Sequence, residues 1–437
     1  MGFALFLVLN FLLFVRPEEL YPAIAGARLY YFTFIACLIF SAQEWLPYLS
    51  LNKLLREPIT SCIILYGLVF TVSNLVAIDF YTARTQGVAF LKLFLYYFVL
   101  TSLLNTESRL RTFLKTLVVL TFMVSCILYL DHFEIMHFEA IEPYMQNEYD
   151  TDGSIIDVFP RLRYLGYFQD PNDLSMILGV GILAALYLCW SGSSILRVFW
   201  IVPVGTFAYL MVLTQSRGGL LGLAAGIAVF FVCRLGWKRA LPLALAGVAG
   251  LLLAVGGRQA NFSLESGTGQ DRLRIWSDGL TMMSQPRSFL FGIGYGRYEE
   301  EVGHVAHNSY VHAFVETGFL GGMIFSGMCV LGFSLVYRQR SAWFSYQSPT
   351  LATLQPFLLA MLADYLICMF SLTRNYVEPT YLMLGLMTVF LRLSYDENDL
   401  SWYRMDVRMM MIIAGLGLSV YGVLKVFLMM FVQFGTS

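Results

Sequence analysis

The chain has 437 residues, of which 58% are hydrophobic and 13% charged, and its formal net charge is −1. So few charges exclude a soluble globular protein of this length, and the near-neutral balance excludes a nucleic-acid-binding protein. Apolar runs of ~15–25 residues recur from end to end, as a series of membrane-spanning helices requires.

Hydropathy predicts an all-α, polytopic transmembrane helical bundle of 12–13 spans that forms one integral-membrane domain over residues 1–437. The run from Met1 to Val15 lacks a basic leader and a small-residue cleavage site, so we interpret it as the first span. The predicted spans are 2–15, 21–42, 59–78, 88–105, 113–130, 173–190, 196–215, 218–233, 240–256, 308–337, 351–372, 380–394 and 408–432. Two long polar loops, at about 131–172 and 257–307, are expected on the same side, and the second is expected to be partly helical.

Basic residues of the short loops gather on one side, which is therefore expected to be the cytoplasm. The opposite, outer face carries almost only arginine: Arg16, Arg28, Arg84, Arg161, Arg163, Arg217, Arg258, Arg272, Arg274, Arg287, Arg297 and Arg374. The planar guanidinium fork suits phosphate, so this set predicts a polyanionic ligand on the outer face. The alternative for any single arginine is a contact with a lipid headgroup or a nearby carboxylate.

The segment from Arg163 to Asp173 precedes a predicted span. Asp170 is expected to cap the helix, with Pro171 in its first turn. A divalent-metal site at Asp170 and Asp173 is the alternative, and we assign no metal ligand. Arg163 and Arg84 are weaker candidates for anion binding.

The next motif begins at Ser216. Arg217 stands at the outer end of a predicted span, and Gly218 and Gly219 begin the next helix. Backbone N–H groups at a helix start and an adjacent guanidinium form an anion site. Alternatively, the glycines of this helix allow close contact between helices in lipid.

The second long loop contains an expected amphipathic helix, whose apolar residues recur at spacings of three and four: Leu273, Trp276, Leu280 and Met283. Arg272 lies one turn before Trp276, and Arg274 follows it. The helix is expected to end near Pro286, before the turn-rich segment 292–296.

His307 stands at the mouth of a predicted span, with Asn308 or Ser309 available as the helix N-cap. A neutral imidazole on the outer surface can accept a proton from an attacking hydroxyl. The alternative is a structural histidine at the membrane interface. Glu316 lies more than two turns further along the same helix, and its role is open.

These segments, in this order, resemble the O-antigen ligase superfamily. The stretch from His307 to Gly321 fits its pattern: His, then Asn, Ser or Gln, nine residues, Gly, two residues, and Gly, Thr or Tyr. The turn at Ser216, the Arg272 helix and the glycine turn precede it, so the likeness covers about residues 160–325. The superfamily contains O-antigen ligases, polysaccharide polymerases and protein O-oligosaccharyltransferases.

The resemblance implies a membrane glycosyltransferase of the GT-C type that is inverting, metal-independent and without a cofactor. It implies an undecaprenyl-diphosphate-linked glycan as donor, an active site facing the periplasm from the bacterial inner membrane, and His307 as the catalytic residue. Arg217 and Arg272 are expected to bind the diphosphate, as are the weaker candidates Arg163 and Arg84. The supporting residues are Asn308, Tyr310, Gly218, Gly219 and Arg274. Because Arg274 lies close to Arg272 on the same helix, which of these two arginines enters the pocket stays open.

The remaining hypotheses about function differ in the molecule that accepts the glycan. A ligase transfers the glycan to lipid A core, whereas a polymerase transfers it to a second lipid-linked glycan. A lipid-glycan transporter is the more distant alternative, but the sequence lacks the paired half-repeats expected of one. The leading hypothesis is the ligase.

Overall fold

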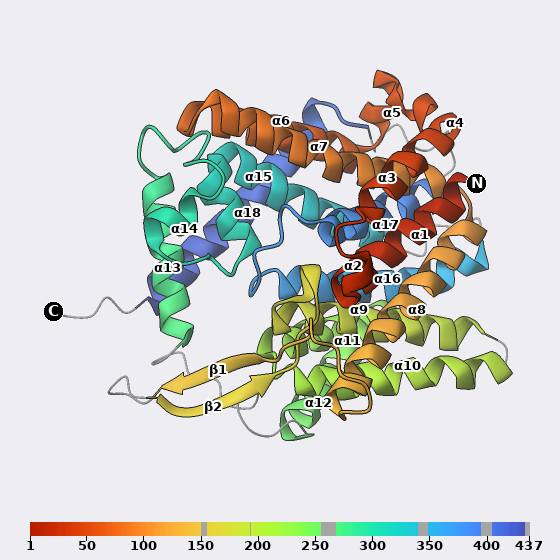
Figure 1. The fold of residues 1–437 in the computed structure, drawn as a ribbon. Helices are drawn as coiled ribbons and strands as arrows, with labels where there is room; N and C mark the ends of the chain where they lie inside the picture. The colour runs from red at the N-terminus through yellow and green to blue at the C-terminus, as the bar shows by residue number, and fades with distance from the viewer. Residues whose placement is uncertain (150–154, 193, 255–267, 340–347, 395–403, 433–437) are drawn as a thin grey trace. The chain divides into compact units, whose positions relative to one another are not determined.

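The structure is a computed structural model that describes residues 1–149, 155–192, 194–254, 268–339, 348–394 and 404–432. These residues are mainly helical, as Figure 1 shows, which confirms the predicted all-α polytopic fold. They group into two compact units, each built from three separate stretches of chain. The prediction of a single domain stays a prediction, and each unit is described by itself.

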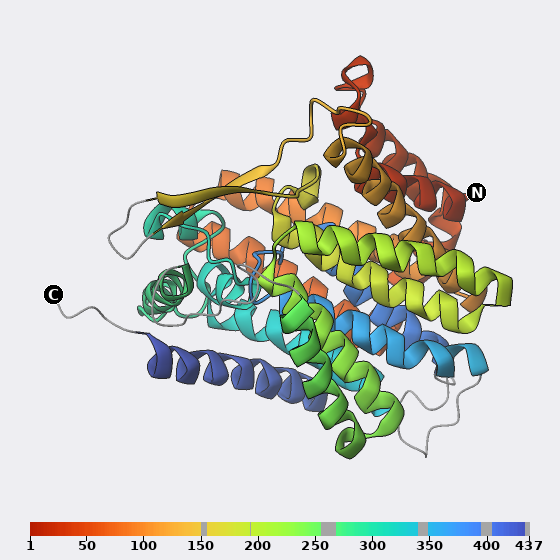
Figure 2. The same cartoon turned by 90° about the horizontal axis from the view of Figure 1, so that it is seen from below.

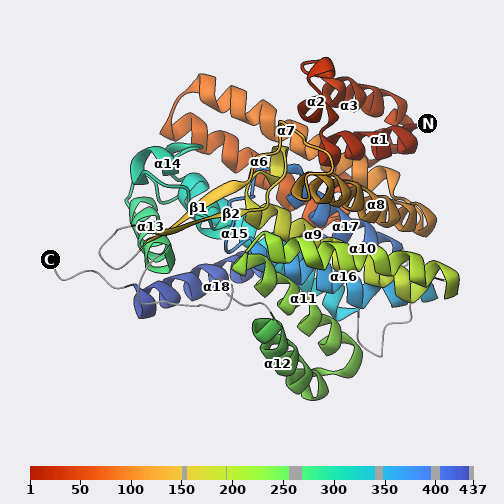
Figure 3. The same ribbon diagram turned by 60° about the horizontal axis from the view of Figure 1, so that its bottom comes forward.

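The first unit combines Met1–Pro47, Val99–Asn261 and Gln339–Cys368. Its elements are α1 Gly2–Val15, α2 Pro17–Leu20, η1 Pro22–Ile24, α3 Leu29–Phe40, α4 Ala42–Trp45, α8 Glu107–His132, β1 Tyr144–Tyr149, β2 Ile155–Arg161, η3 Gly166–Phe168, α9 Pro171–Ser191, α10 Ser194–Leu213, α11 Arg217–Leu235, α12 Trp237–Ala254 and α16 Pro349–Cys368. Helix α9 packs against α8, α10, α11 and α16, and Figures 2 and 3 show α9 and α10 side by side.

The second unit combines Tyr48–Phe98, Phe262–Arg338 and Met369–Ser437. Its helices are α5 Leu51–Arg56, α6 Pro58–Ala77, α13 Thr268–Met283, α14 Arg297–Val302, α15 Ser309–Arg338, α17 Glu378–Ser394 and α18 Val407–Phe431. Along the chain, η2 (Leu46–Leu49) and α7 (Phe80–Leu103) pass from one unit to the other. Helix α15 is central to this unit because it packs against α6, α13, α14, α17 and α18.

Eight of the described helices are long and apolar enough to cross a membrane: α6, α7, α8, α9, α11, α15, α16 and α18. A ninth span results if α3 and the following residues 42–49, bent by 58°, are counted together. Of the other predicted spans, 2–15 and 380–394 fall on α1 with 14 residues and α17 with 17, and 196–215 and 240–256 fall on α10 and α12. Membrane-spanning helices are therefore confirmed, and the number of 12–13 spans stays a prediction.

Residues 21–42 do not form one continuous span, contrary to the sequence prediction. They divide into η1 and α3, and α3 begins only at Leu29. The carboxylate of Glu18 accepts hydrogen bonds from the backbone N–H groups of Arg28 and Leu29. This carboxylate satisfies amides at the start of α3, which have no partner within the helix.

An antiparallel hairpin of β1 and β2 occupies part of the first long loop, where no strand was predicted. In its register Tyr144 pairs with Arg161 and Asn147 pairs with Val158. The second long loop is partly helical, as predicted, because it contains α13 and α14. Its first residues, including the predicted outer arginine at 258, lie outside the described residues.

Candidate active site

His307 occupies a strained turn at the start of α15. Its φ of 46° lies in the left-handed region, which residues other than glycine seldom adopt. Asn308 is fully buried, and its Oδ1 accepts hydrogen bonds from the backbone N–H of Tyr310 (3.0 Å) and of Val311 (3.1 Å). Asn308 is therefore the N-cap of α15, one of the two caps predicted. The cap fixes the residue directly after the histidine.

Helix α13 is tied to the same turn by a tryptophan. Trp276 Nε1 donates a hydrogen bond of 2.6 Å to the carbonyl oxygen of Ala306, the residue directly before His307. The predicted apolar face of α13 is buried at all four positions: Leu273, Trp276, Leu280 and Met283. Arg272 is half-buried and Arg274 is exposed on this helix. The arginine helix and the histidine turn thus form one local structure within the second unit.

The segment before α17 also holds the start of α15. The backbone N–H of Ser309 donates to the carbonyl oxygen of Met369 (2.8 Å), and its hydroxyl donates to that of Leu372 (2.6 Å). The same hydroxyl accepts a hydrogen bond from the backbone N–H of Arg374 (2.8 Å). The backbone of Arg374 is therefore hydrogen-bonded to Ser309, which lies two residues after His307. The sequence did not reveal this proximity.

His312 and Glu316 form a buried pair one and two turns into α15. His312 Nε2 lies 3.3 Å from Glu316 Oε1, and the Glu316 side chain is 1% exposed. His312 Nδ1 lies 3.1 Å from Asn375 Nδ2. Because an amide nitrogen donates only, Nδ1 must accept, so Nε2 carries the proton that faces the carboxylate. Neither His312 nor Asn375 was predicted as a site residue, although the spacing of four between His312 and Glu316 places them on one helix face.

Glu316 also fixes the glycine turn that precedes the histidine. Its Oε1 accepts a hydrogen bond from Gly296 N (2.7 Å), and its carbonyl oxygen accepts one from Gly294 N (3.0 Å). A Cβ atom at Gly292 would lie 2.4 Å from the Glu316 carbonyl oxygen. The predicted close-approach segment is therefore confirmed, and the role left open for Glu316 is to hold this turn.

Helix α15 is broken inside the histidine motif. Gly318 has φ 69° and ψ −173°, outside the helical region. The interruption lets the backbone of Phe319 and Leu320 donate hydrogen bonds to Phe289 and Leu290. This backbone pairing explains physically why the motif needs a glycine eleven residues after its histidine.

Tyrosines surround the His312 pair. The Tyr298 ring lies 5.8 Å from the His312 ring, and the Tyr376 ring lies 5.8 Å from it on another side. Burial raises the pKa of Tyr298 and of Tyr376 well above the ordinary value, so both phenols keep their protons. Tyr298 uses its proton to donate to the Ile275 carbonyl oxygen of α13 (2.7 Å).

The Ser216 turn lies in the first unit, and Ser216 is the N-cap of α11. Ser216 Oγ accepts a hydrogen bond from Gly219 N (3.1 Å), and Arg217 is the first residue of α11. Ser216 also donates to Asn172 Oδ1 (2.7 Å) at the start of α9. Arg217 is half-buried at a helix start whose cap leaves further backbone N–H groups for an anion.

The glycines of α11 confirm the packing alternative as well. A Cβ atom at Gly219 would lie 1.8 Å from Ser175 Oγ of α9, and one at Gly222 would lie 2.5 Å from Asp364 Oδ1 of α16. The carbonyl oxygen of Gly218 lies 3.6 Å from the Cys368 thiol, which donates to it. Close packing on both sides fixes the direction of the helix that Arg217 begins.

Arg161 holds the β-hairpin on this turn. It is 6% exposed and donates from Nε to the Thr214 carbonyl oxygen (2.9 Å) and from Nη2 to Asn172 Oδ1 (3.0 Å). At the start of α9, Asp170 Oδ1 accepts a hydrogen bond from Asn172 N (2.8 Å), with Pro171 in the first turn. The predicted helix cap is thus confirmed, and it accounts for Asp170.

The remaining predicted residues have different surroundings. Arg163 donates from Nε to the Glu142 carbonyl oxygen (2.7 Å), and Arg84 is exposed on α7. Tyr310 is 4% exposed, with its ring 4.6 Å from that of Phe370, so it packs in the protein interior. Arg16 pairs with Glu19 (2.8 Å), which is the carboxylate alternative stated above for a single arginine.

Residues 202–326 match the family model of O-antigen ligase. Over this segment the chain is similar to the O-antigen ligase family. The matched range includes Arg217, Arg272 and His307, together with the glycine break at 318. No curated protein matches the chain. The described helices indicate a polytopic membrane protein, and residues 202–326 are similar to O-antigen ligase.

Proposed function

We propose that this chain transfers a glycan from undecaprenyl diphosphate to an acceptor sugar on the outer face of the bacterial inner membrane. The acceptor proposed is lipid A core, which makes the chain an O-antigen ligase. The observation that carries the proposal is the local structure around His307. The family match covers this histidine, and Trp276 joins its turn to the helix of Arg272.

In the proposed reaction His307 accepts the proton of the acceptor hydroxyl as the hydroxyl oxygen attacks the anomeric carbon. The new glycosidic bond forms on the side opposite the bond that breaks, so the anomeric configuration inverts. The bonding electrons leave with the lipid diphosphate. Arg217 and Arg272 stabilise the negative charge on this leaving group, a role that permanently charged guanidinium groups perform without a metal ion.

The hydrogen bonds of the turn support the proposal that His307 is positioned to act as a general base. A general base must lie within about 2.6–3.2 Å of the proton that it removes. The Asn308 cap and the Ala306 hydrogen bond restrain the residues on both sides of His307. A restrained backbone reduces the entropy lost when the acceptor and the donor reach a reactive geometry.

The test supplies the purified full-length protein with lipid-linked glycan and one of two acceptors, lipid A core or a second lipid-linked glycan, and sizes the products. Glycan on lipid A core supports the ligase. Chain growth without lipid A core contradicts the ligase and supports a polymerase of the same superfamily. Movement of intact donor across proteoliposomes without a new glycosidic bond contradicts both and supports a transporter.

Two histidine variants control the assay. His307→Ala is expected to form no product. His304→Ala serves as the matched control, because His304 is an exposed residue three positions earlier in the same loop. Equal loss of product in both variants would point to general damage of the loop rather than to a catalytic base.

A further inference from the structure

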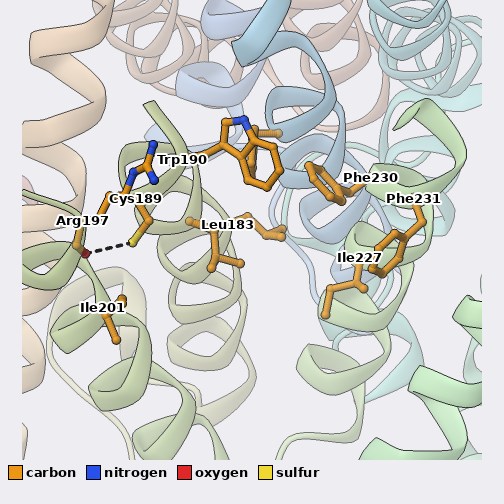
Figure 4. Close-up of a pocket in the computed structure, with 10 residues that line it drawn as sticks. Leu183, Cys189, Trp190, Arg197, Ile201, Ile227, Phe230 and Phe231 are labelled. Atoms are coloured by element: carbon orange, nitrogen blue, oxygen red, sulfur yellow. Dashed lines mark hydrogen bonds between the residues drawn. The ribbon is translucent and has the colours of Figure 1, made fainter. Parts of the chain in front are cut away.

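A cavity of about 670 Å³ lies within the first unit, among α9, α10, α11 and α16. Figure 4 shows the side chains that line it, which come from all four helices. They include Leu183, Leu186, Trp190, Ile201, Ile227, Phe230, Phe231 and Phe357. The volume falls within the ~300–1,000 Å³ range of pockets that hold small ligands. The wall is apolar and partly aromatic, so its occupant must present hydrocarbon.

Arginines gather at one end of this cavity. Arg197 lines it and donates from Nε to the Gly192 carbonyl oxygen (3.1 Å). The guanidinium of Arg234 lies 5.0 Å from the centre of the Trp190 ring, another lining residue. Arg111 donates to the carbonyl oxygen of Ser191 (3.0 Å). In the part of the chain that the structure describes, no carboxylate forms an ion pair with any of these three arginines.

The cavity and the Ser216 turn belong to opposite ends of the same helices. Asn172, which binds Ser216, lies at the start of α9, whereas Trp190 lies at its end. Eighteen residues of helix separate them, which corresponds to roughly 27 Å at 1.5 Å per residue. This length is close to the ~30 Å hydrocarbon thickness of a bilayer. The cavity therefore belongs to the leaflet opposite the proposed diphosphate site.

We propose that this cavity binds one anionic phospholipid of that opposite leaflet, with an acyl chain among the aromatic side chains and the phosphate beside Arg197 and Arg234. Charge and position together favour this ligand. Basic pockets between transmembrane helices on the cytoplasmic side bind anionic lipid headgroups. The positive-inside bias of the sequence places this end in the cytoplasm. Bound in this way, the lipid would join α9, α10 and α11 at the end remote from the Ser216 turn.

The experiment measures lipid binding to the purified full-length protein by native mass spectrometry, with phosphatidylglycerol and phosphatidylcholine as probes. The variants are Arg197→Gln combined with Arg234→Gln, and Ile227→Trp, which fills the cavity. Arg239→Gln is the matched control, because Arg239 is an exposed arginine on the neighbouring helix α12 that does not line the cavity. Circular dichroism verifies that each variant is folded.

The native protein is expected to retain phosphatidylglycerol in preference to phosphatidylcholine. About 1 kcal/mol per basic residue corresponds to roughly five-fold in affinity, so the double variant is expected to bind phosphatidylglycerol about 25-fold more weakly. Arg239→Gln is expected to bind it like the native chain. A folded Ile227→Trp variant is expected to lose the lipid as well.

Three results would overturn the proposal: equal binding of the two lipids, unchanged binding in the double variant, or an equal loss in the Arg239→Gln control. Displacement of phosphatidylglycerol by a polyprenyl diphosphate would assign the cavity to the donor instead. Because the assay measures binding and not transfer, its outcome is independent of whether the proposed ligase activity is correct.

Discussion

Replacing Gly318 by alanine tests whether the break in α15 is required by the fold. The backbone angles of Gly318 belong to a region that only glycine populates freely, which costs another residue about 1–3 kcal/mol. The added Cβ would also lie 2.4 Å from Gly292 N and from the carbonyl atoms of Leu290. These are backbone atoms, so relieving the overlap costs a further ~1–3 kcal/mol. The expected loss in the free energy of unfolding is about 2–6 kcal/mol.

Gly422→Ala is the matched control. Gly422 lies in α18 with no heavy atom within 4 Å of an added Cβ, so alanine there is expected to be neutral or to stabilise by about 0.5–1 kcal/mol. Thermal unfolding of both variants in detergent can be followed with a thiol-reactive fluorescent dye, because all seven cysteines are free and four are buried. At one heating rate, Gly318→Ala is expected to lower the midpoint by roughly 2–7 °C, because the shift per kcal/mol falls as the chain becomes longer. Equal midpoints for the two variants would refute the strain argument.

His307→Ala is expected to abolish transfer while retaining folding and donor binding, measured by product formation and by binding of lipid-linked glycan; full activity would exclude the general-base role. Arg217→Lys is expected to lose most activity because lysine cannot grip a diphosphate in bidentate fashion, and an unchanged transfer rate would identify a structural arginine. Trp276→Phe removes the hydrogen bond to Ala306 and is expected to lower kcat by up to ~100-fold, whereas Trp237→Phe, an exposed control, is expected to have no effect. A chelator is expected to leave the transfer rate unchanged, and loss of activity restored by a divalent cation would contradict the metal-independent mechanism.

The sequence was sufficient for features that depend on local chemistry. Periodic apolar residues predicted the buried face of α13, and the predicted cap positions before α9 and α15 are confirmed by the hydrogen bonds of Asp170 and Asn308. These signals are readable because a helix buries one face at fixed spacing and leaves its first amides unsatisfied. The histidine motif was recognised by its resemblance to the pattern of a known family, and the family match agrees with it.

Features that depend on contacts between distant segments were not readable from the sequence. The β-hairpin depends on Arg161, which reaches residues 53 positions away along the chain. Asn375 contacts His312 across 63 positions. No local pattern predicts such pairs, because each residue has the same local preferences whether or not its distant partner is present. Helix length was also misjudged where short helices meet, as in residues 21–42.

His307 illustrates most clearly which features the sequence determined and which the tertiary structure determined. The sequence by itself determined that a histidine stands at the start of a membrane helix, because the cap and the apolar run are local features. Only the tertiary structure decided what holds that histidine: the Trp276 side chain of another helix and the Ser309 contacts to the segment that follows α16. The physical reason is that a hydrogen bond between segments forms only after the whole chain has brought its donor and acceptor together.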